Sequence, residues 1–288
     1  MKLWKMQGAG NDFLILDNRQ EMVADLSRLT ERICHRHFGI GADGLMALSD
    51  SSLGAIRMTY FNADGTRDTM CGNGIRCLAK FARDNGIVKE KKFTIETEDG
   101  LKKIEMIREE KALSQVRIDM GGYTFDTGVL QIDTEQAEFI SQPLKMKDGR
   151  IFFVSCVHLG VNHGVIFVED DLDYVGMYGS ELEHHPVFQA DMNLNFVKRI
   201  DPSHLEVSTW ERGAGRTLAC GTGVSSSVVV AGRLFEMETV VEVKAPGGKL
   251  TITRLDNGTV LMEGPAAKVA EVTLEEEEMP ERKGEQDD

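Results

Sequence analysis

Residues 70–77, MCGNGIRC, and residues 219–227, ACGTGVSSS, share an arrangement that organises the chain. In each, a cysteine stands directly before a glycine-rich turn that opens into an apolar run of helical length. Cys71 and Cys220 are therefore predicted at the starts of two helices. The free backbone N–H groups and the positive dipole end of such a helix favour a thiolate over a thiol, and they also suit a carboxylate.

The likeness extends upstream of the cysteines. FNADGTRDTMCGNG at 61–74 aligns without a gap with WERGAGRTLACGTG at 210–223, which sets Asn62 on Glu211. The two cysteines are 149 residues apart, far more than a solenoid repeat, so the pattern indicates a duplicated domain with a cleft between the halves. Glycine-rich turns can recur by chance, but the match includes the cysteine itself.

Strand-like segments surround each cysteine helix. The segment 224–236 is apolar on nearly all faces, as expected of a helix enclosed by sheet. Further helices are predicted over 25–37, begun by Asp25, and near 179–185, and two separate strands over 258–263 and from 267 onward. We predict an α+β fold of two pseudo-symmetric domains, each a sheet or barrel wrapped around a central helix, with the active site in the cleft between them.

Composition excludes several classes of protein. The formal net charge of −14 argues against nucleic acid as a partner. No apolar run has the length of a membrane span, and the N-terminus lacks a signal-peptide core. Five cysteines, an odd number in a chain of 288 residues, indicate a reducing cytoplasm rather than a secreted disulfide framework. Residues 275–288 are rich in acids and are predicted as a disordered tail.

The remaining sequence offers no second reactive centre. Cys34, Cys77 and Cys156 are predicted to be small buried hydrophobes. Neither the cysteines nor the histidines show a zinc-ligand spacing, and no lysine stands in a pyridoxal-phosphate context. We therefore expect no metal and no cofactor.

Two thiols that face each other across a cleft suit the inversion of an α-carbon. Without pyridoxal phosphate, one base must remove the Cα proton and an acid must return a proton to the opposite face; a thiolate and a thiol meet that need and exchange roles with direction. Helix N-termini can stabilise the carbanion through its carboxylate. Cys71 and Cys220 are the predicted acid/base pair. The predicted carboxylate cradle consists of the backbone amides of Gly72, Asn73, Gly221 and Thr222.

The motifs KMQGAGNDF, HFGIGADG, FNADG with MCGNGIRC, and WERGAG with ACGTG resemble, in this order, the diaminopimelate epimerase family. The resemblance covers residues 1 to about 273 and implies a cofactor-independent isomerase that interconverts LL- and meso-diaminopimelate, for lysine and peptidoglycan precursors. It implies that the last strand returns to the first domain, so the expected domains are 1–119, completed by 265–274, and 120–264. A small-molecule amino acid is the expected partner, and a homodimer is left open.

The resemblance also implies which residues bind the substrate. Its amino groups and far end are assigned to Asn11, Asn62, Asn193, Glu211 and Arg212. His163 and Glu211 are expected to help set the protonation state of the thiols.

The sequence departs from the family at four positions. The usual Asn-Pro-His reads Val161-Asn162-His163, so an amide has become apolar or moved by one position. The other departures, which we place with it on the distal-recognition side, are Gln189, Asn195 and Arg216. A lost polar contact relaxes or changes specificity, so another α-amino acid such as histidine is the alternative substrate.

Two other classes of protein remain as alternatives. A pair of low-pKa cysteines can form a dithiol redox switch, and a cleft can bind an amino acid without turning it over. Redox pairs are usually close in sequence, as in C-x-x-C, whereas these cysteines lie in matched halves. Exchange of solvent deuterium into Cα separates the epimerase from both.

Overall fold

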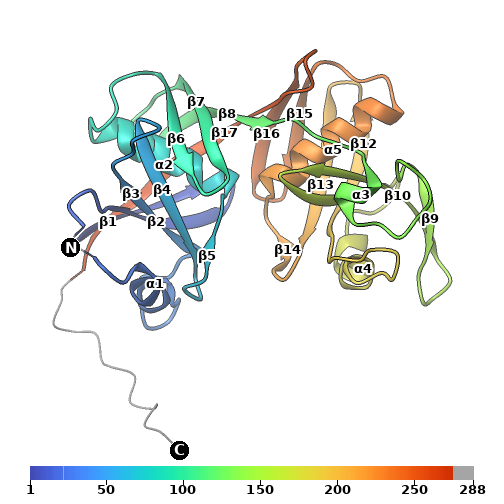
Figure 1. The fold of residues 1–288 in the computed structure, drawn as a ribbon, viewed down its shortest axis with the longest axis horizontal. Coiled ribbons are helices and arrows are strands. Elements are labelled where there is room, and N and C mark those ends of the chain that lie inside the picture. The colour runs from blue at the N-terminus through green and yellow to red at the C-terminus, as the bar shows by residue number, and fades with distance from the viewer. Residues whose placement is uncertain (22, 275–288) are drawn as a thin grey trace, which may run out of the picture.

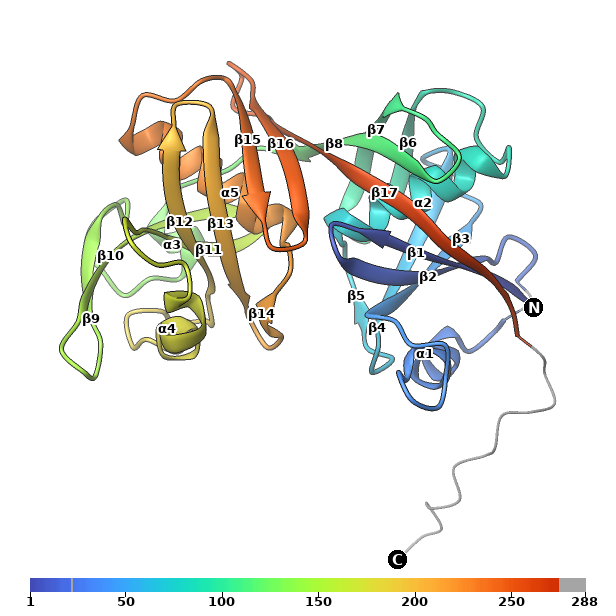
Figure 2. The same cartoon turned by 180° about the vertical axis from the view of Figure 1, so that it is seen from behind.

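The computed structural model describes residues 1–21 and 23–274, and Figures 1 and 2 show two lobes joined by two long strands. The predicted acidic tail over 275–288 lies outside the described residues. Within the described residues, no helix is both long enough and apolar enough to span a membrane.

From β10 (Ile151–Leu159) onward, the second lobe repeats the order of elements of the first. The first comprises β1 (Lys2–Gly8), β2 (Asn11–Asp17), α1 (Leu26–Cys34), β3 (Gly44–Ser49), β4 (Ile56–Asn62), β5 (Arg67–Asp68), α2 (Gly72–Asp84), β6 (Lys92–Thr97), β7 (Gly100–Arg108) and β8 (Leu113–Gly121). The second comprises α3 (Thr127–Leu130), β9 (Gln142–Lys145), β10 (Ile151–Leu159), β11 (Val161–Phe167), α4 (Tyr174–Glu183), β12 (Asn193–Asp201), β13 (His204–Glu211), β14 (Gly215–Thr217), α5 (Gly221–Leu234), β15 (Val240–Ala245), β16 (Gly248–Arg254) and β17 (Val260–Thr273).

The first lobe is a closed barrel around α2. Its ring of pairings runs β1, β2, β3, β4, β6, β7, β8, β17 and back to β1. All of α2 from Gly72 to Ala82 is buried, so the barrel encloses the helix on every side. Two pairs in the ring are parallel, β2 with β3 and β4 with β6, and each is bridged by a helix.

The second lobe repeats this plan around α5. Pairing runs from β10 through β11, β12, β13, β15 and β16 to β17, again with two parallel pairs, β11 with β12 and β13 with β15. A single bridge between Thr124 and His158 connects β10 to the segment that continues β8. The predicted fold class is confirmed, and the sequence repeat corresponds to a repeat of strand order.

β17 passes from one lobe to the other. It pairs with β16 up to Glu263 and with β1 from Ala267, and it runs beside β8 throughout this passage. Pro265 lies between the two pairings, where a missing N–H costs no ladder hydrogen bond. The prediction of two separate strands here is wrong, because the glycine and proline lie inside one extended strand instead of a turn.

The helices agree with the sequence in kind but less well in their bounds. Asp25 caps α1 as predicted, since its side chain accepts a hydrogen bond from the Arg28 N–H. α1 ends at Cys34, and α4 begins at Tyr174, five residues before the predicted start. α2 ends at Asn85 and Gly86 as predicted, and Gly86 has a positive φ of 66°.

Candidate active site

The two predicted cysteines lie at the starts of the two central helices. Cys71 is the N-cap of α2 and is partly buried; Cys220 is the N-cap of α5 and is buried. The two helix starts meet: a Cβ added to Gly221 would lie 3.8 Å from the Gly72 Cα and 2.9 Å from the Met262 sulfur. A side chain at Gly221 would therefore reach the Gly72 backbone at van der Waals distance and would displace the Met262 side chain. The repeat therefore brings both cysteine motifs to one place.

A hydrogen bond joins the two motifs directly. The side-chain amide of Asn73 donates to the Ala219 carbonyl at 2.8 Å, one residue before Cys220. Arg76 orients that amide, because its guanidinium donates to the Asn73 Oδ1 at 2.8 Å. The side chain of Asn73 is thus part of the junction between lobes, and only its backbone amide remains for the predicted carboxylate cradle.

Arg76 is fully buried at the junction. It also donates to the carbonyls of Gly72 and Pro265, both at 3.1 Å, and so joins α2 to β17. Gly264 makes room for it, since an added Cβ there would lie 3.0 Å from the guanidinium carbon. Burial lowers the pKa of Arg76 to about 10. No carboxylate among residues 1–21 and 23–274 forms an ion pair with it, which leaves a positive charge beside the helix starts.

Burial governs both thiols in this substrate-free structure. It raises the pKa of Cys71 to about 11, although the backbone N–H groups of Gly74 and Asn73 act in the opposite direction. It also raises the pKa of the Cys220 thiol well above its usual range, again against a neighbouring backbone N–H. The expectation that the helix starts favour thiolates is therefore wrong for this state, because the loss of solvation outweighs the helix N–H groups.

Glu211 is a carboxylate whose charge acts on both thiols. It ends β13, and its Oε1 accepts a hydrogen bond from the Thr217 hydroxyl at 2.6 Å. Its negative charge raises the pKa of Cys71 and of Cys220. The Thr222 hydroxyl lies 3.3 Å from the Cys220 sulfur. Glu211 can thus act on the protonation of either thiol.

His163 lies in the wall of the second lobe and is fully buried. Its Nδ1 lies 3.1 Å from the side-chain amide nitrogen of Asn195, so Nδ1 accepts and Nε2 carries the proton. Nε2 has no hydrogen-bond partner among the described residues. Burial, with the nearby His158, lowers the pKa of His163 to about 3, so the ring is neutral.

Two predicted substrate-binding asparagines lie on the first lobe. The side-chain oxygen of Asn11 lies 3.7 Å from the Cys71 sulfur and accepts from the thiol. Asn62, at the end of β4, accepts from the Tyr60 hydroxyl at 2.8 Å and donates to the Thr66 hydroxyl at 3.1 Å. Asn11 is therefore in contact with the reactive thiol, whereas Asn62 is held in the turn after β4.

Two further residues predicted to bind the substrate, Asn193 and Arg212, lie on the second lobe. The Asn193 side chain accepts from the Arg212 backbone N–H at 3.0 Å and donates to the Asn162 carbonyl at 2.9 Å, which ties the starts of β11 and β12 to the end of β13. The Arg212 side chain is exposed and forms no ion pair within the described part of the chain. A guanidinium of this kind can receive a substrate carboxylate.

One supporting residue could not be found from the sequence. Glu183, the last residue of α4, is buried and accepts from the Trp210 indole N–H at 2.7 Å and from the Gly213 backbone N–H at 3.0 Å. It therefore fixes the turn that carries Glu211 and Arg212. A single glutamate in a weakly amphipathic helix gives no sequence signal of this contact.

Two of the four departures do not lie where we expected them. Asn195 is fully buried and accepts from the Thr209 hydroxyl at 2.9 Å, so it belongs to the barrel interior below α5. Arg216 forms an ion pair with Asp173 at 2.8 Å, which joins β14 to the start of α4. The placement of these two on the distal-recognition side is wrong. Gln189 is exposed, and its N–H donates to the Gln131 carbonyl.

Val161 occupies the position of the first residue of the family's usual Asn-Pro-His. Alternate residues of a strand point to opposite faces, so Val161 shares the face of His163 while Asn162 points the other way. The Asn162 side chain bonds to the Leu130 carbonyl at 2.9 Å and lies 2.7 Å from the His158 Nδ1. The amide has therefore not moved by one position, and an apolar side chain stands in its place.

The family model described as "Diaminopimelate epimerase" matches residues 3–125 and 155–269. A diaminopimelate epimerase of Alkaliphilus metalliredigens is 44% identical over 93% of this chain and 95% of its own, and one of Methanothermobacter thermautotrophicus is 40% identical over 92% and 95%.

Solved structures share the fold at low sequence identity. A protein of the PhzF phenazine-biosynthesis family from Bacillus anthracis superposes with a TM-score of 0.65 and 16% identity, over 94% of this chain and 98% of its own. A hydroxyproline epimerase from Agrobacterium vitis gives 0.66 and 11%, over 94% and 91%. At these identities the likeness concerns the fold alone.

Proposed function

The chain belongs to the diaminopimelate epimerase family, and we propose that it converts LL-diaminopimelate to meso-diaminopimelate by proton transfer between the two thiols. The observation that carries this proposal is the meeting of the two helix starts at Gly72 and Gly221, each directly after a cysteine. An α-carboxylate held between these starts has one thiol on each side.

The reaction needs one thiolate and one thiol. The thiolate takes the Cα proton, the electron pair passes to the carboxylate, and the opposite thiol returns its own proton to Cα with inversion. The backbone N–H groups of Gly72, Asn73, Gly221 and Thr222 stabilise the charge on the carboxylate, because four donors and two dipole ends point to one place.

Substrate binding must accompany ionisation of a thiol, because burial disfavours both thiolates in the absence of substrate. Glu211 supports this step as a base beside Cys220, with Thr217 holding its other oxygen. His163 is our second candidate for a role in the protonation of the thiols, and its neutral ring has no hydrogen-bond partner at Nε2 among the described residues.

The far end of the substrate is assigned to the second lobe and to Asn62. Arg212 supplies an unpaired exposed guanidinium for the distal carboxylate, and Asn193 fixes its backbone. Val161 offers no hydrogen bond where the family has an amide. That absence is the observation that keeps another α-amino acid as the second candidate substrate.

The test is exchange of solvent deuterium into Cα. Purified protein is incubated in deuterated water with LL-diaminopimelate and with a panel of other L-amino acids, and Cα deuterium is measured by mass spectrometry. We expect exchange with diaminopimelate and little with the others, and loss of exchange in Cys71→Ala and in Cys220→Ala. Cys156→Ala, which removes a buried thiol in a hydrophobic cluster separate from that of Cys71, is the matched control.

Strong exchange with another amino acid and none with diaminopimelate would replace the substrate and keep the mechanism. Full activity after both reactive thiols are alkylated would refute the mechanism. Binding without any exchange would leave an amino-acid-binding protein.

We also propose a cytoplasmic location and leave a homodimer as a prediction. The location is supported by the sequence and by five unpaired cysteines, of which Cys34, Cys77 and Cys156 are buried in hydrophobic clusters. The negative charge of the chain supports a small-molecule partner rather than nucleic acid.

A further inference from the structure

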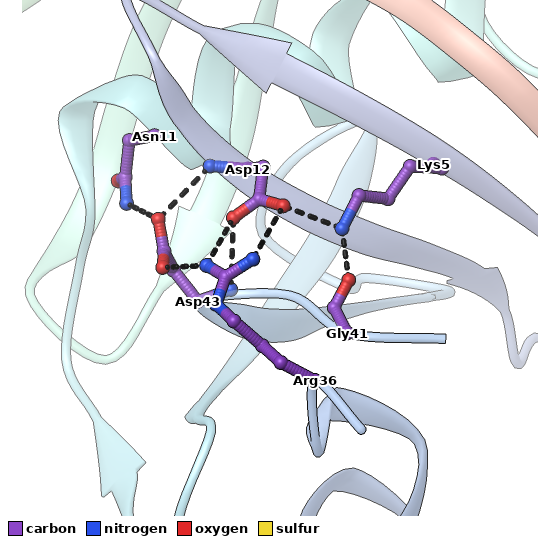
Figure 3. Close-up of polar contacts among 6 residues, drawn as sticks. All are labelled: Lys5, Asn11, Asp12, Arg36, Gly41 and Asp43. Carbon is purple, nitrogen blue, oxygen red and sulfur yellow. Dashed lines mark hydrogen bonds and ion pairs between the residues drawn. The ribbon is translucent and has the colours of Figure 1, made fainter. Parts of the chain in front are cut away.

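We infer that Asp43 is a positioning residue that fixes the side-chain amide of Asn11 with its oxygen toward the Cys71 sulfur, and so keeps Cys71 a thiol in the substrate-free enzyme. The inference rests on the proposed function, in which Cys71 exchanges a proton with the substrate. Figure 3 shows the contacts around Asn11.

The first step concerns the two ends of the Asn11 amide. Its nitrogen donates to Asp43 Oδ2 at 2.5 Å, and its oxygen accepts from the Cys71 thiol at 3.7 Å. A carboxylate accepts hydrogen bonds and cannot donate them. The end of Asn11 that faces Asp43 must therefore be the NH₂ group, which leaves the oxygen for the thiol.

The second step concerns what holds Asp43 as an acceptor. Its Oδ2 also receives the Asp12 backbone N–H at 3.1 Å, and its Oδ1 receives Arg36 at 2.6 Å. Every group that contacts the Asp43 side chain is thus a donor. Neighbouring ion pairs fix this arrangement, because Asp12 pairs with Arg36 at 2.9 Å and with Lys5 at 2.5 Å, and Lys5 also donates to the Gly41 carbonyl (Figure 3).

The charges in this network are firmly set. Burial raises the pKa of Asp12, but the hydrogen bonds from Arg36 and Lys5 outweigh it and lower the pKa to about 2. Asp12 and Arg36 therefore stay charged near neutral pH and hold Asp43 from the side away from the thiol.

The third step concerns the thiol. A hydrogen bond from S–H to an oxygen exists only while the thiol keeps its proton, so it favours the neutral form. An NH₂ group in the same place would favour the thiolate. The other groups that face Cys71 are Glu211 from β13, Arg76 from α2 and Tyr60 from β4. Within the described residues none of these three forms a hydrogen bond with the Asp43 carboxylate, although its charge raises the pKa of Tyr60. The loss of this charge is common to Asp43→Asn and Asp43→Ala, so the difference between the two variants reports the orientation of Asn11.

The test measures alkylation of Cys71 by iodoacetamide in the full-length protein without substrate, at one mildly alkaline pH. The rate follows the thiolate fraction, and mass spectrometry of peptides assigns it to Cys71 or to Cys220. Because no turnover is needed, the result is independent of whether diaminopimelate is the substrate.

In Asp43→Asn, Arg36 retains the remaining oxygen because it is the charged donor, and the new NH₂ group replaces Oδ2, so the Asp12 backbone N–H and the Asn11 amide both lose their acceptor. Two NH₂ groups cannot share a hydrogen bond, so Asn11 rotates and turns its own NH₂ toward Cys71. We expect alkylation of Cys71 to become roughly fivefold faster, the size of one net hydrogen bond. Asp43→Ala only releases the amide, so its acceleration should be smaller, and that of Cys220 should not change.

Two further variants complete the design. In the Asn11→Ala background, Asp43→Asn and Asp43→Ala should give equal rates, because without the Asn11 amide only the loss of the Asp43 charge remains. The control variant is Asp17→Asn, because Asp17 lies on β2, the strand of Asn11, and pairs with Arg19. It should leave the alkylation rates of Cys71 and Cys220 unchanged.

A general loosening of the lobe predicts the reverse order, with Ala faster than the isosteric Asn and Cys220 accelerated as well. That order, equal rates in wild type and Asp43→Asn, or full additivity with Asn11→Ala would each overturn the inference.

Discussion

Replacement of Arg76 by methionine tests whether the junction of the two lobes depends on a buried charge. The guanidinium donates to the oxygens of Asn73 and Gly72 in α2 and to the carbonyl of Pro265 in β17, the strand that runs between the lobes. Methionine keeps most of the side-chain length and removes all three donors.

The magnitude follows from two opposing terms. A hydrogen bond from a charged group contributes about 1.5–3 kcal/mol, and three buried oxygens lose their partner. Methionine avoids the burial of an unpaired charge, which costs several kcal/mol. We expect a net loss of about 3 kcal/mol in the free energy of unfolding, and a lower kcat because the Asn73 amide that reaches Ala219 is no longer oriented.

Urea unfolding measures the free energy of unfolding, and exchange of deuterium into Cα of the substrate measures the change in kcat. Arg76→Lys keeps the charge but has one nitrogen for three acceptors, so it should lie between wild type and Arg76→Met. Arg233→Met, at an exposed arginine that pairs with Glu138, should change stability by less than about 0.5 kcal/mol.

If Arg76→Met unfolded at the wild-type urea concentration and kept its rate of exchange, the junction would not depend on this arginine. A stable but inactive Arg76→Met would show instead that its charge matters to the chemistry and not to the fold.

Three further outcomes are expected. In the folded protein His163 stays neutral, whereas in the unfolded chain it binds a proton below about pH 6.5. The free energy of unfolding should therefore fall by about 1.4 kcal/mol per pH unit from there toward pH 3. His163→Gln should flatten this slope in urea titrations, and equal slopes for the two proteins would contradict the assignment. Glu183→Gln should raise KM more than it lowers kcat, because the turn that carries Arg212 loses one of two hydrogen bonds; an unchanged KM would argue against that support. Gly221→Ala should lower kcat about tenfold, because the added methyl group displaces the Met262 side chain and occupies space between the helix starts, whereas Gly122→Ala, where an added Cβ meets nothing within 4 Å, should not. Equal rates for the two variants would count against a reaction between the helix starts.

Much of the fold could be predicted because the sequence contains an internal repeat. The alignment of Asn62 with Glu211 indicated a duplicated domain, and the structure repeats both the parallel pairs and the enclosed helix in each lobe. The starts of α2 and α5 follow from local signals, a cysteine before glycine and then an apolar run. The long strand β17 did not follow, because Pro265 reads as a turn unless one knows that it lies between two partners.

The candidate site was less predictable, since burial is a tertiary property. The helix starts alone favour thiolates, but the sequence does not show how completely the lobes remove water from Cys71 and Cys220. Asn195 was misplaced for a similar reason: it is polar, and only the structure shows it satisfied inside the barrel. Asp43 is one acid in a glycine-rich loop, and its contact with Asn11 depends on β2 and β3 being neighbours.

The strands that cross between the lobes also constrain how the chain can acquire its structure during synthesis. While a ribosome is still adding residues beyond β16, β1 and β8 have no partner on one edge, because the first barrel closes only when residues 260–273 arrive. Open edges of this kind invite pairing with other chains. The second lobe in turn pairs with the segment that follows β8, through the Thr124–His158 bridge to β10. Neither half is then a self-sufficient folding unit, and a nascent chain must wait for its last strand before either lobe is complete.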